Sequence, residues 1–147
     1  MAIDNLLIRK LKAEDADDIS EIHAAITQTP VNPDFKHIIE DQALKDEGVN
    51  FVAELEGRVV GYMVCYFLSG GFGIEKSAWI AMLGVNPDYM GQGIGAGLAN
   101  EIFTVVKAAG ITTVYTSVEW DSVDLLSFFK TLGFNRSNFI NLRKTLD

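Results

Sequence analysis

The sequence is poor in the residues that mark several common classes of protein. It has one cysteine, Cys65, which excludes an internal disulfide, and two histidines, too few for a recognisable zinc site. Acidic residues outnumber basic ones by 20 to 12, so the net charge of −8 argues against a nucleic-acid surface. No apolar run reaches the roughly 20 residues that span a bilayer. We therefore expect no metal, no nucleic acid and no membrane among the partners.

The residues that are present favour one compact domain over 1–147. A hydrophobic content of 48% suits a single core, and the first residues lack the basic and then apolar pattern of a secretion signal, which favours the cytoplasm. Periodicity predicts helices at 13–26, 35–44, 93–109 and 122–132, and strands at 6–11, 51–55, 59–67, 79–85, 114–118, 134–136 and 139–144. The predicted class is α/β (α+β), a mixed sheet of about six to seven strands flanked by about four helices.

The most informative stretch runs from Leu83 to Leu98, where a strand, a turn, a glycine cluster and a helix start follow one another. Glycines allow close approach to a ligand, and the free amides of a helix start attract an anion, so we expect a bound diphosphate. No lysine follows the glycines, which excludes a P-loop. Gly91, Gly93 and Ala96 fit a dinucleotide fingerprint loosely, because four residues separate the strand from Gly91. A nucleotide-dependent oxidoreductase and a plain glycine turn both stay open as alternatives.

This stretch resembles the GNAT superfamily of N-acetyltransferases. The family's strand ending in Leu-x-Val-x-Pro, followed by Gln/Arg-x-x-Gly-x-Gly/Ala, is matched by Leu83, Val85, Pro87, Gly93 and Gly95, while Met90 replaces the Gln/Arg. The resemblance implies a GNAT fold and acetyl-coenzyme A as co-substrate. It also implies that main-chain amides of Gly91, Gly93, Gly95 and Ala96 hold the pyrophosphate. Main-chain groups of Leu83 and Val85 would then bind pantetheine between two strands that splay apart.

A second family segment resembles residues 113–134, a strand and a helix ending before Gly133-Phe134. The family's usual asparagine and its proton-donating tyrosine fall on Ser122 and Phe129, and we expect both positions to border the coenzyme. Phenylalanine cannot donate a proton. The thiolate of coenzyme A, whose thiol has a pKa of ~8.5, is a tolerable leaving group even without an acid. Water, Tyr89 or Tyr115 is therefore expected as the proton donor.

Acceptor recognition and deprotonation are assigned less directly. Glu119, after the strand beside the expected thioester, is the candidate base or water-holding carboxylate, with a solvated strand end as its alternative. Phe35, at the end of the linker 30–35, and the loop residues Phe72 and Glu75 are candidates for binding the acceptor. The predicted function is transfer of an acetyl group to a primary amine of a small molecule or a protein, by direct attack. The alternative is an acyl-coenzyme A sensor that has lost catalysis, and the apolar pair Phe139-Ile140 would permit a homodimer.

Overall fold

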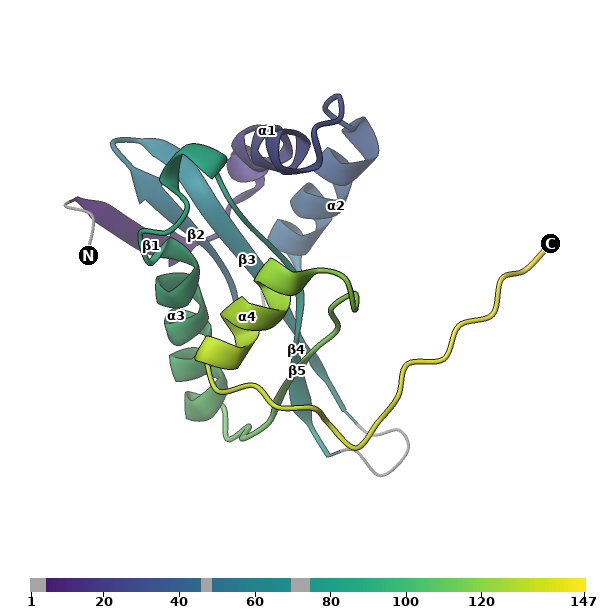
Figure 1. The fold of residues 1–147 in the computed structure, drawn as a ribbon. Coiled ribbons are helices and arrows are strands. Elements are labelled where there is room, and N and C mark those ends of the chain that lie inside the picture. Colours follow the sequence, from purple (N-terminus) through teal and green to yellow (C-terminus); the bar gives the residue numbers. More distant parts are fainter. Residues whose placement is uncertain (1–4, 46–48, 70–74) are drawn as a thin grey trace. The chain divides into compact units, whose positions relative to one another are not determined.

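The computed structural model describes residues 5–45, 49–69 and 75–147. The chain forms two compact units, Met1–Ser117 and Val118–Asp147, and each is described by itself. Figure 1 shows the elements of both units, coloured along the sequence. The predicted extent of one domain over 1–147 stays a prediction.

The first unit contains all the strands and three of the helices found in the described residues. Its elements are, in chain order, β1 (Leu6–Lys10), the 3-10 turn η1 (Ala13–Asp15), α1 (Ala16–Thr27), α2 (Pro33–Leu44), β2 (Asn50–Leu55), β3 (Arg58–Leu68), β4 (Ser77–Val85), the 3-10 turn η2 (Pro87–Tyr89), α3 (Ile94–Ala108) and β5 (Val114–Thr116). These bounds agree with the predicted helices and strands to within a few residues.

The five strands form one mixed sheet in the order β1-β2-β3-β4-β5. The first four are antiparallel neighbours, and β5 runs parallel to β4, which confirms the predicted crossover through α3. Glu56 and Gly57 join β2 to β3 with φ of 52° and 82°. Two consecutive positive φ values are typical of a tight turn that matches strand twist, as predicted for this hairpin.

The two faces of the sheet are covered by different helices (Figure 1). On one face, buried residues of α1 and α2, including Ile19 and Ile39, form a core cluster with Tyr62 and Val64 of β3. On the other face, Gly61 lies against Ile94 of α3. Adjacent residues of a strand point to opposite faces, so α1 and α2 cover one face and α3 covers the other.

The helix ends follow local sequence signals. The Asn32 side chain accepts the amide of Asp34 at 2.9 Å at the start of α2, with Pro33 in the first turn. At the end of α3, Gly110 has φ of 81°, and its amide donates to Lys107 at 3.0 Å. A glycine is favoured at that position because the left-handed conformation strains other residues.

A charged network fixes the start of α1 against the sheet edge. Arg9 of β1 donates to both carboxylate oxygens of Asp15, at 2.9 and 2.8 Å, and to Glu54 of β2 at 3.0 Å. Asp15 also accepts the amide of Lys12 at 2.8 Å, and its side chain is only 8% exposed. These contacts raise the pKa of Arg9 further above its ordinary value, chiefly through the bonds to Asp15.

The second unit contains α4 (Val123–Thr131) followed by an extended segment. The Phe134 amide donates to Phe129 at 3.0 Å after Gly133, whose φ of 92° ends the helix. The predicted strands at 134–136 and 139–144 are wrong, because the structure has no strand from 134 to 147. A strand needs a neighbour to satisfy its backbone groups, and the pattern alone did not supply one. Within residues 5–45, 49–69 and 75–147, the sheet therefore has five strands rather than six or seven.

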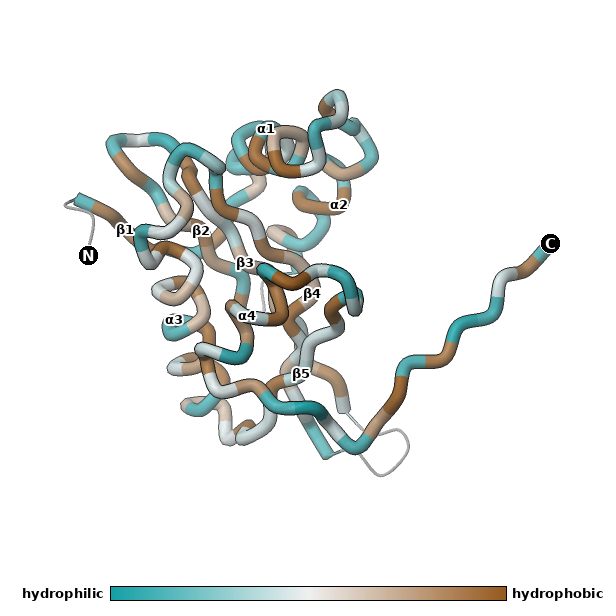
Figure 2. Tube along the Cα trace, viewed as in Figure 1, coloured by the Kyte–Doolittle hydropathy of each residue, from teal (hydrophilic) through white to brown (hydrophobic). Residues whose placement is uncertain are grey.

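The extended segment keeps an amphipathic composition. Figure 2 shows apolar and polar residues interspersed along it. Phe139, Ile140, Leu142 and Leu146 are between 47% and 84% exposed.

Among the described residues, no helix is both long and apolar enough to pass through a bilayer.

Candidate functional site

The outer edge of β4 is paired with another strand over only its first part. Parallel pairing with β5 covers Ala78, Trp79 and Ile80 and then stops. The hydroxyl of Thr116, the last residue of β5, donates to the Ile80 carbonyl at 3.0 Å. Within the described chain, residues 81–85 of β4 therefore have a strand partner only on the β3 side. The pairing ends where the expected splay of the two strands would begin, and the splay itself stays a prediction.

A β-bulge decides which backbone groups face this open edge. Cys65 of β3 pairs with Ile80 and Val64 pairs with Met82, so Ala81 is an extra residue in β4. Past the bulge, the Asn86 amide donates to Val60 of β3 at 2.8 Å.

Backbone direction alternates along a strand, and this sets the groups on each side of β4. Since the backbone amide of Asn86 faces β3, the N–H and C=O groups of Gly84 and Met82 face β3 too. The N–H and C=O groups of Leu83 and Val85 consequently point to the open edge. An extended ligand placed there could form the bonds that a sixth strand would form.

The open edge leads into the glycine loop. The Asn86 side chain accepts the amide of Asp88 at 2.9 Å and begins η2. Gly91 and Gly93 then adopt φ of 78° and 85°, and neither has an atom within 4 Å of the position of an added Cβ. These glycines are needed for their backbone conformation rather than for lack of space.

The loop ends at the N-terminus of α3. Gly93 occupies the N-cap position, no side chain caps the helix, and the Gly97 amide makes the first helical bond, to Gly93 at 3.0 Å. The amides of residues 94–96 have no carbonyl partner in the helix. The first turn carries no acidic residue. Free amides and the helix dipole together make this end suitable for an anion.

Tyr62 of β3 lies across β4 next to the open edge. Tyr62 and Gly84 are cross-strand partners. A Cβ added to Gly84 would lie 2.7 Å from Cε1 and 2.9 Å from both Cζ and Oη of Tyr62. The outer half of the ring therefore occupies the space that a side chain at position 84 would fill. Sequence reasoning did not single out Tyr62, although a glycine inside the strand pattern was the available signal.

An aromatic row continues from Tyr62 toward the helices. The Phe35 ring of α2 lies 6.4 Å from the Tyr62 ring in an edge-on arrangement, and it stacks on His23 of α1 at 4.0 Å with 6° between the planes. Burial raises the pKa of Tyr62 to about 12. Phe35, a predicted acceptor-binding residue, thus lies against Tyr62, whose ring covers Gly84 of β4.

The other predicted residues of the first unit are spread over three places. Tyr89 is half-buried at the end of η2, directly before the glycine loop. Tyr115 of β5 stacks on Trp79 of β4, with the ring centroids 4.7 Å apart. Glu75 is exposed just before β4. Phe72 lies outside the described residues.

The predicted residues of the second unit are described within that unit. Glu119 is exposed, and its carbonyl accepts the Ser122 amide at 3.0 Å. Ser122 is the N-cap of α4, but its side chain makes no capping bond. Phe129 is 4% exposed and lies edge-on to Phe128 and Phe134. Their roles toward a coenzyme stay predictions.

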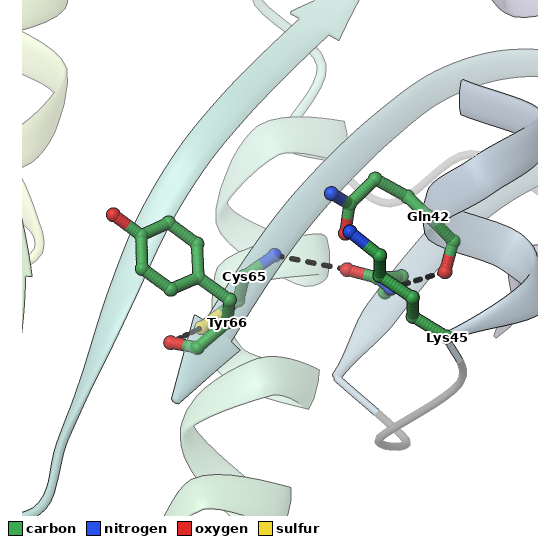
Figure 3. Close-up of a pocket in the computed structure, with 5 residues that line it drawn as sticks. Gln42, Lys45, Cys65 and Tyr66 are labelled. Atoms are coloured by element: carbon green, nitrogen blue, oxygen red, sulfur yellow. Dashed lines mark hydrogen bonds between the residues drawn. The ribbon is translucent and has the colours of Figure 1, made fainter. Parts of the chain in front are cut away.

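A pocket of about 260 Å³ lies elsewhere on the first unit, at the end of α2. Its lining residues are Gln42, Lys45, Asn50, Cys65 and Tyr66 (Figure 3). The Asn50 side chain accepts the Cys65 amide at 3.1 Å and donates to the Gln42 carbonyl at 3.3 Å. The pocket contains none of the residues predicted from the sequence.

Metal-binding groups are dispersed. In the part of the chain that the structure describes, no three His, Cys, Asp or Glu side chains lie close enough to hold an ion. His23 stacks on Phe35, and His37 lies 3.1 Å from Glu40.

Comparisons with known proteins agree with this geometry. The acetyltransferase (GNAT) family model matches residues 16–134. An uncharacterized N-acetyltransferase of Methanocaldococcus jannaschii is 33% identical over 100 residues, which cover 65% of this chain and 43% of that protein. The matched region thus spans less than half the length of that relative.

Solved structures support the fold. An aminoglycoside acetyltransferase from an uncultured soil metagenomic sample is 21% identical, with a TM-score of 0.78 over 98% of each chain. The aminoglycoside acetyltransferase AAC(6')-Iy, solved with a coenzyme A bisubstrate analogue, is 14% identical, with a TM-score of 0.78 over 96% of this chain and 99% of that one. The family match and the antiparallel β3–β4 pair argue against the dinucleotide alternative. This chain belongs to the GNAT acetyltransferase family.

Proposed function

We propose that this protein transfers the acetyl group of acetyl-coenzyme A to a primary amine by direct attack in a ternary complex. The observation that carries the proposal is the unpaired edge of β4. Outward-facing backbone groups of Leu83 and Val85 lead directly into a glycine loop and an uncapped helix start. The family match to residues 16–134 supports the same reaction.

The backbone supplies most of the proposed coenzyme site. The amides of Gly91, Gly93, Gly95 and Ala96 would hold the pyrophosphate, so the absence of a Gln/Arg at Met90 removes one side-chain contact and leaves these donors in place. Leu83 and Val85 would bind pantetheine as a neighbouring strand does. An outward amide at Val85 would donate to the oxygen of the tetrahedral intermediate, where preorganised donors supply a few kcal/mol.

The proposed chemistry places modest demands on side chains. The amine nitrogen attacks the thioester carbon, the C–S bond breaks, and the electron pair stays on sulfur, a tolerable leaving group. Tyr89 or Tyr115 is the proposed acid, with water as the alternative. Glu119 is the proposed base or water-holding group, and Ser122 and Phe129 are proposed to border the coenzyme.

The acceptor is proposed to be cationic before it reacts. An amine with the pKa of lysine, ~10.4, costs roughly 4 kcal/mol to deprotonate at neutral pH, so a base or a desolvated site aids attack. The net charge of −8 favours encounter with cations. Phe35 and Glu75 are proposed to contact the acceptor, and the structural neighbours named as aminoglycoside acetyltransferases make amine-bearing sugars part of the first panel.

The test is thiol release from acetyl-coenzyme A over polyamines, amino acids, aminoglycosides and short peptides, with coenzyme binding followed by calorimetry. Turnover with one class of amine supports the proposal. Binding without turnover across the panel favours the sensor alternative, which the substitutions at Met90 and Phe129 motivate. Absence of binding would refute the coenzyme site itself.

A pair of substitutions tests the open edge directly. Val85→Pro removes the outward N–H while keeping the bonds that β4 makes to β3, since proline is tolerated where the amide does not serve the sheet. We expect its kcat to fall about a hundredfold. Val85→Ala shortens the same side chain and keeps the amide. Equal losses in the two variants would contradict a role for the amide.

Two further proposals concern assembly and location. We propose that the protein forms a homodimer through the segment that contains Phe139 and Ile140, which are 47% and 77% exposed. Light scattering on the full chain tests it, and a monomer at micromolar concentration would contradict it. A cytoplasmic location fits a single cysteine that is buried.

A further inference from the structure

Tyr62 brings a hydroxyl group from β3 to the open edge of β4. Its cross-strand partner is Gly84, and the ring covers the place where a side chain at 84 would lie. The hydroxyl oxygen is therefore above the β4 backbone, between Leu83 and Val85 along the strand. These are the two residues whose backbone groups face the open edge.

The Tyr62 hydroxyl makes no hydrogen bond to any described residue, although Tyr62 as a whole is only 2% exposed. Within those same residues, Ser20 Oγ is the one side-chain oxygen or nitrogen that is both fully enclosed and without a partner. Among the described residues, the phenol tip of Tyr62 thus has no protein partner. Polar groups in such surroundings usually have a partner, and water or a polar ligand can serve as one here.

The hydroxyl and the anion site lie on opposite faces of the sheet. Gly61 packs against Ile94 and Leu98 of α3, whereas Tyr62 points the other way, toward Phe35 of α2. A coenzyme whose pyrophosphate lies at the start of α3 would therefore approach from the α3 face. Among the described residues of the first unit, the outer edge of β4 at residues 81–85 pairs with no strand beyond it, and this edge borders both faces of the sheet. The Tyr62 face is therefore left for the amine.

We propose that the Tyr62 hydroxyl binds the acceptor amine and aims its lone pair at the thioester carbon, an inference that rests on the proposed function. The hydroxyl oxygen accepts a hydrogen bond from the amine N–H. The N–C bond then forms and gives the tetrahedral intermediate, the C–S bond breaks as the carbonyl forms again, and the proton lost by nitrogen goes to the thiolate through water. Phe35, stacked on His23, supports the ring of Tyr62 in this position.

The environment of Tyr62 suits a positioning group rather than a proton donor or base. Burial raises the pKa of Tyr62 to about 12, so the phenol stays neutral over the whole range in which amines are acetylated. A neutral phenol can accept from an amine and donate to water at the same time. It would not titrate in a rate profile between pH 6 and 10.

The test compares Tyr62→Phe with wild type on an amine that the wild type acetylates. The substitution keeps the ring that packs on Gly84 and Phe35, so the variant should fold with an unchanged melting temperature. We expect kcat/KM for the amine to fall about tenfold, the size of one lost hydrogen bond of about 1.4 kcal/mol. The Kd of acetyl-coenzyme A, measured by calorimetry, should stay within about twofold of wild type.

The matched control is Tyr66→Phe, which removes a hydroxyl from the same face of β3 four residues further along the strand, opposite Trp79. It should leave kcat/KM unchanged. Equal activity of Tyr62→Phe and wild type would overturn the inference and leave the proposed function standing. A changed alkaline limb of the rate profile in Tyr62→Phe would overturn the positioning role, because it would make the phenol a base. Absence of turnover by the wild type with every amine would overturn the proposed function, and the inference with it.

Discussion

Gly84→Ala is the substitution for which the structure gives the sharpest expectation. The new Cβ would lie 2.7 Å from Cε1 and 2.9 Å from Oη of Tyr62, closer than real Cβ atoms come to other atoms. The Tyr62 ring cannot yield easily, since it is 2% exposed and held edge-on by Phe35. Overpacking of this kind costs about 1–3 kcal/mol. In a chain of this size, that lowers the melting temperature by about 3–10 °C.

The assay is urea unfolding of single and double variants, which separates crowding against Tyr62 from a general intolerance of alanine. In a Tyr62→Leu background the crowded atoms are gone, so adding Gly84→Ala should cost much less than it does in wild type. Gly61→Ala is the control, because its Cβ would meet Ile94 Cγ2 at 2.9 Å on the other face. Its cost should be the same in both backgrounds. A Gly84→Ala protein as stable as wild type, or a cost equal in both backgrounds, would refute the reasoning.

Three other perturbations test the anion site, the charged network and the buried phenol. Gly93→Ala should weaken acetyl-coenzyme A binding about tenfold in calorimetry, since φ of 85° strains alanine by about 1–2 kcal/mol. The control is Gly110→Ala, which has φ of 81° and equally open surroundings. It should lower the melting temperature as much as Gly93→Ala does and leave the Kd of acetyl-coenzyme A unchanged. Asp15→Asn should lower the free energy of unfolding in urea by about 3 kcal/mol, because Arg9 loses the partner that accepts two of its bonds; a change below the error of the fit would contradict this. Because burial raises the pKa of Tyr62 from 10.0 to about 12, the folded state keeps a proton that the unfolded chain releases above pH 10. The free energy of unfolding should therefore fall between pH 10 and 12 by up to about 2–3 kcal/mol more in wild type than in Tyr62→Phe, and parallel pH curves for the two proteins would exclude that shift.

Most of the first unit could be predicted from the sequence because its signals are local. Apolar spacing located its three helices, and a charged turn with Gly57 located the hairpin between β2 and β3. The glycine loop was also visible, since its conformation is set by Gly91 and Gly93 themselves. The uncapped start of α3 follows from such neighbouring residues alone.

The rest depends on contacts between distant residues. Nothing local marks Ala81 as a bulged residue, because the bulge exists only through the pairing of β4 with β3. The position of Tyr62 over Gly84 joins residues 22 positions apart. The strands predicted at 134–136 and 139–144 failed for the converse reason, since an alternating pattern needs a paired neighbour and the structure provides none there.

The bulge at Ala81 makes the direction of the β4 backbone groups depend on the exact number of residues in the strand. One residue inserted or deleted between Ile80 and Val85 would exchange the backbone groups that face outward with those that hold β3. It would also turn position 84 away from Tyr62. The side chains between Ile80 and Val85 can therefore be substituted more easily than the number of residues there can change. An alignment of related chains that places a gap here would equate strands that present different backbone atoms at their free edges.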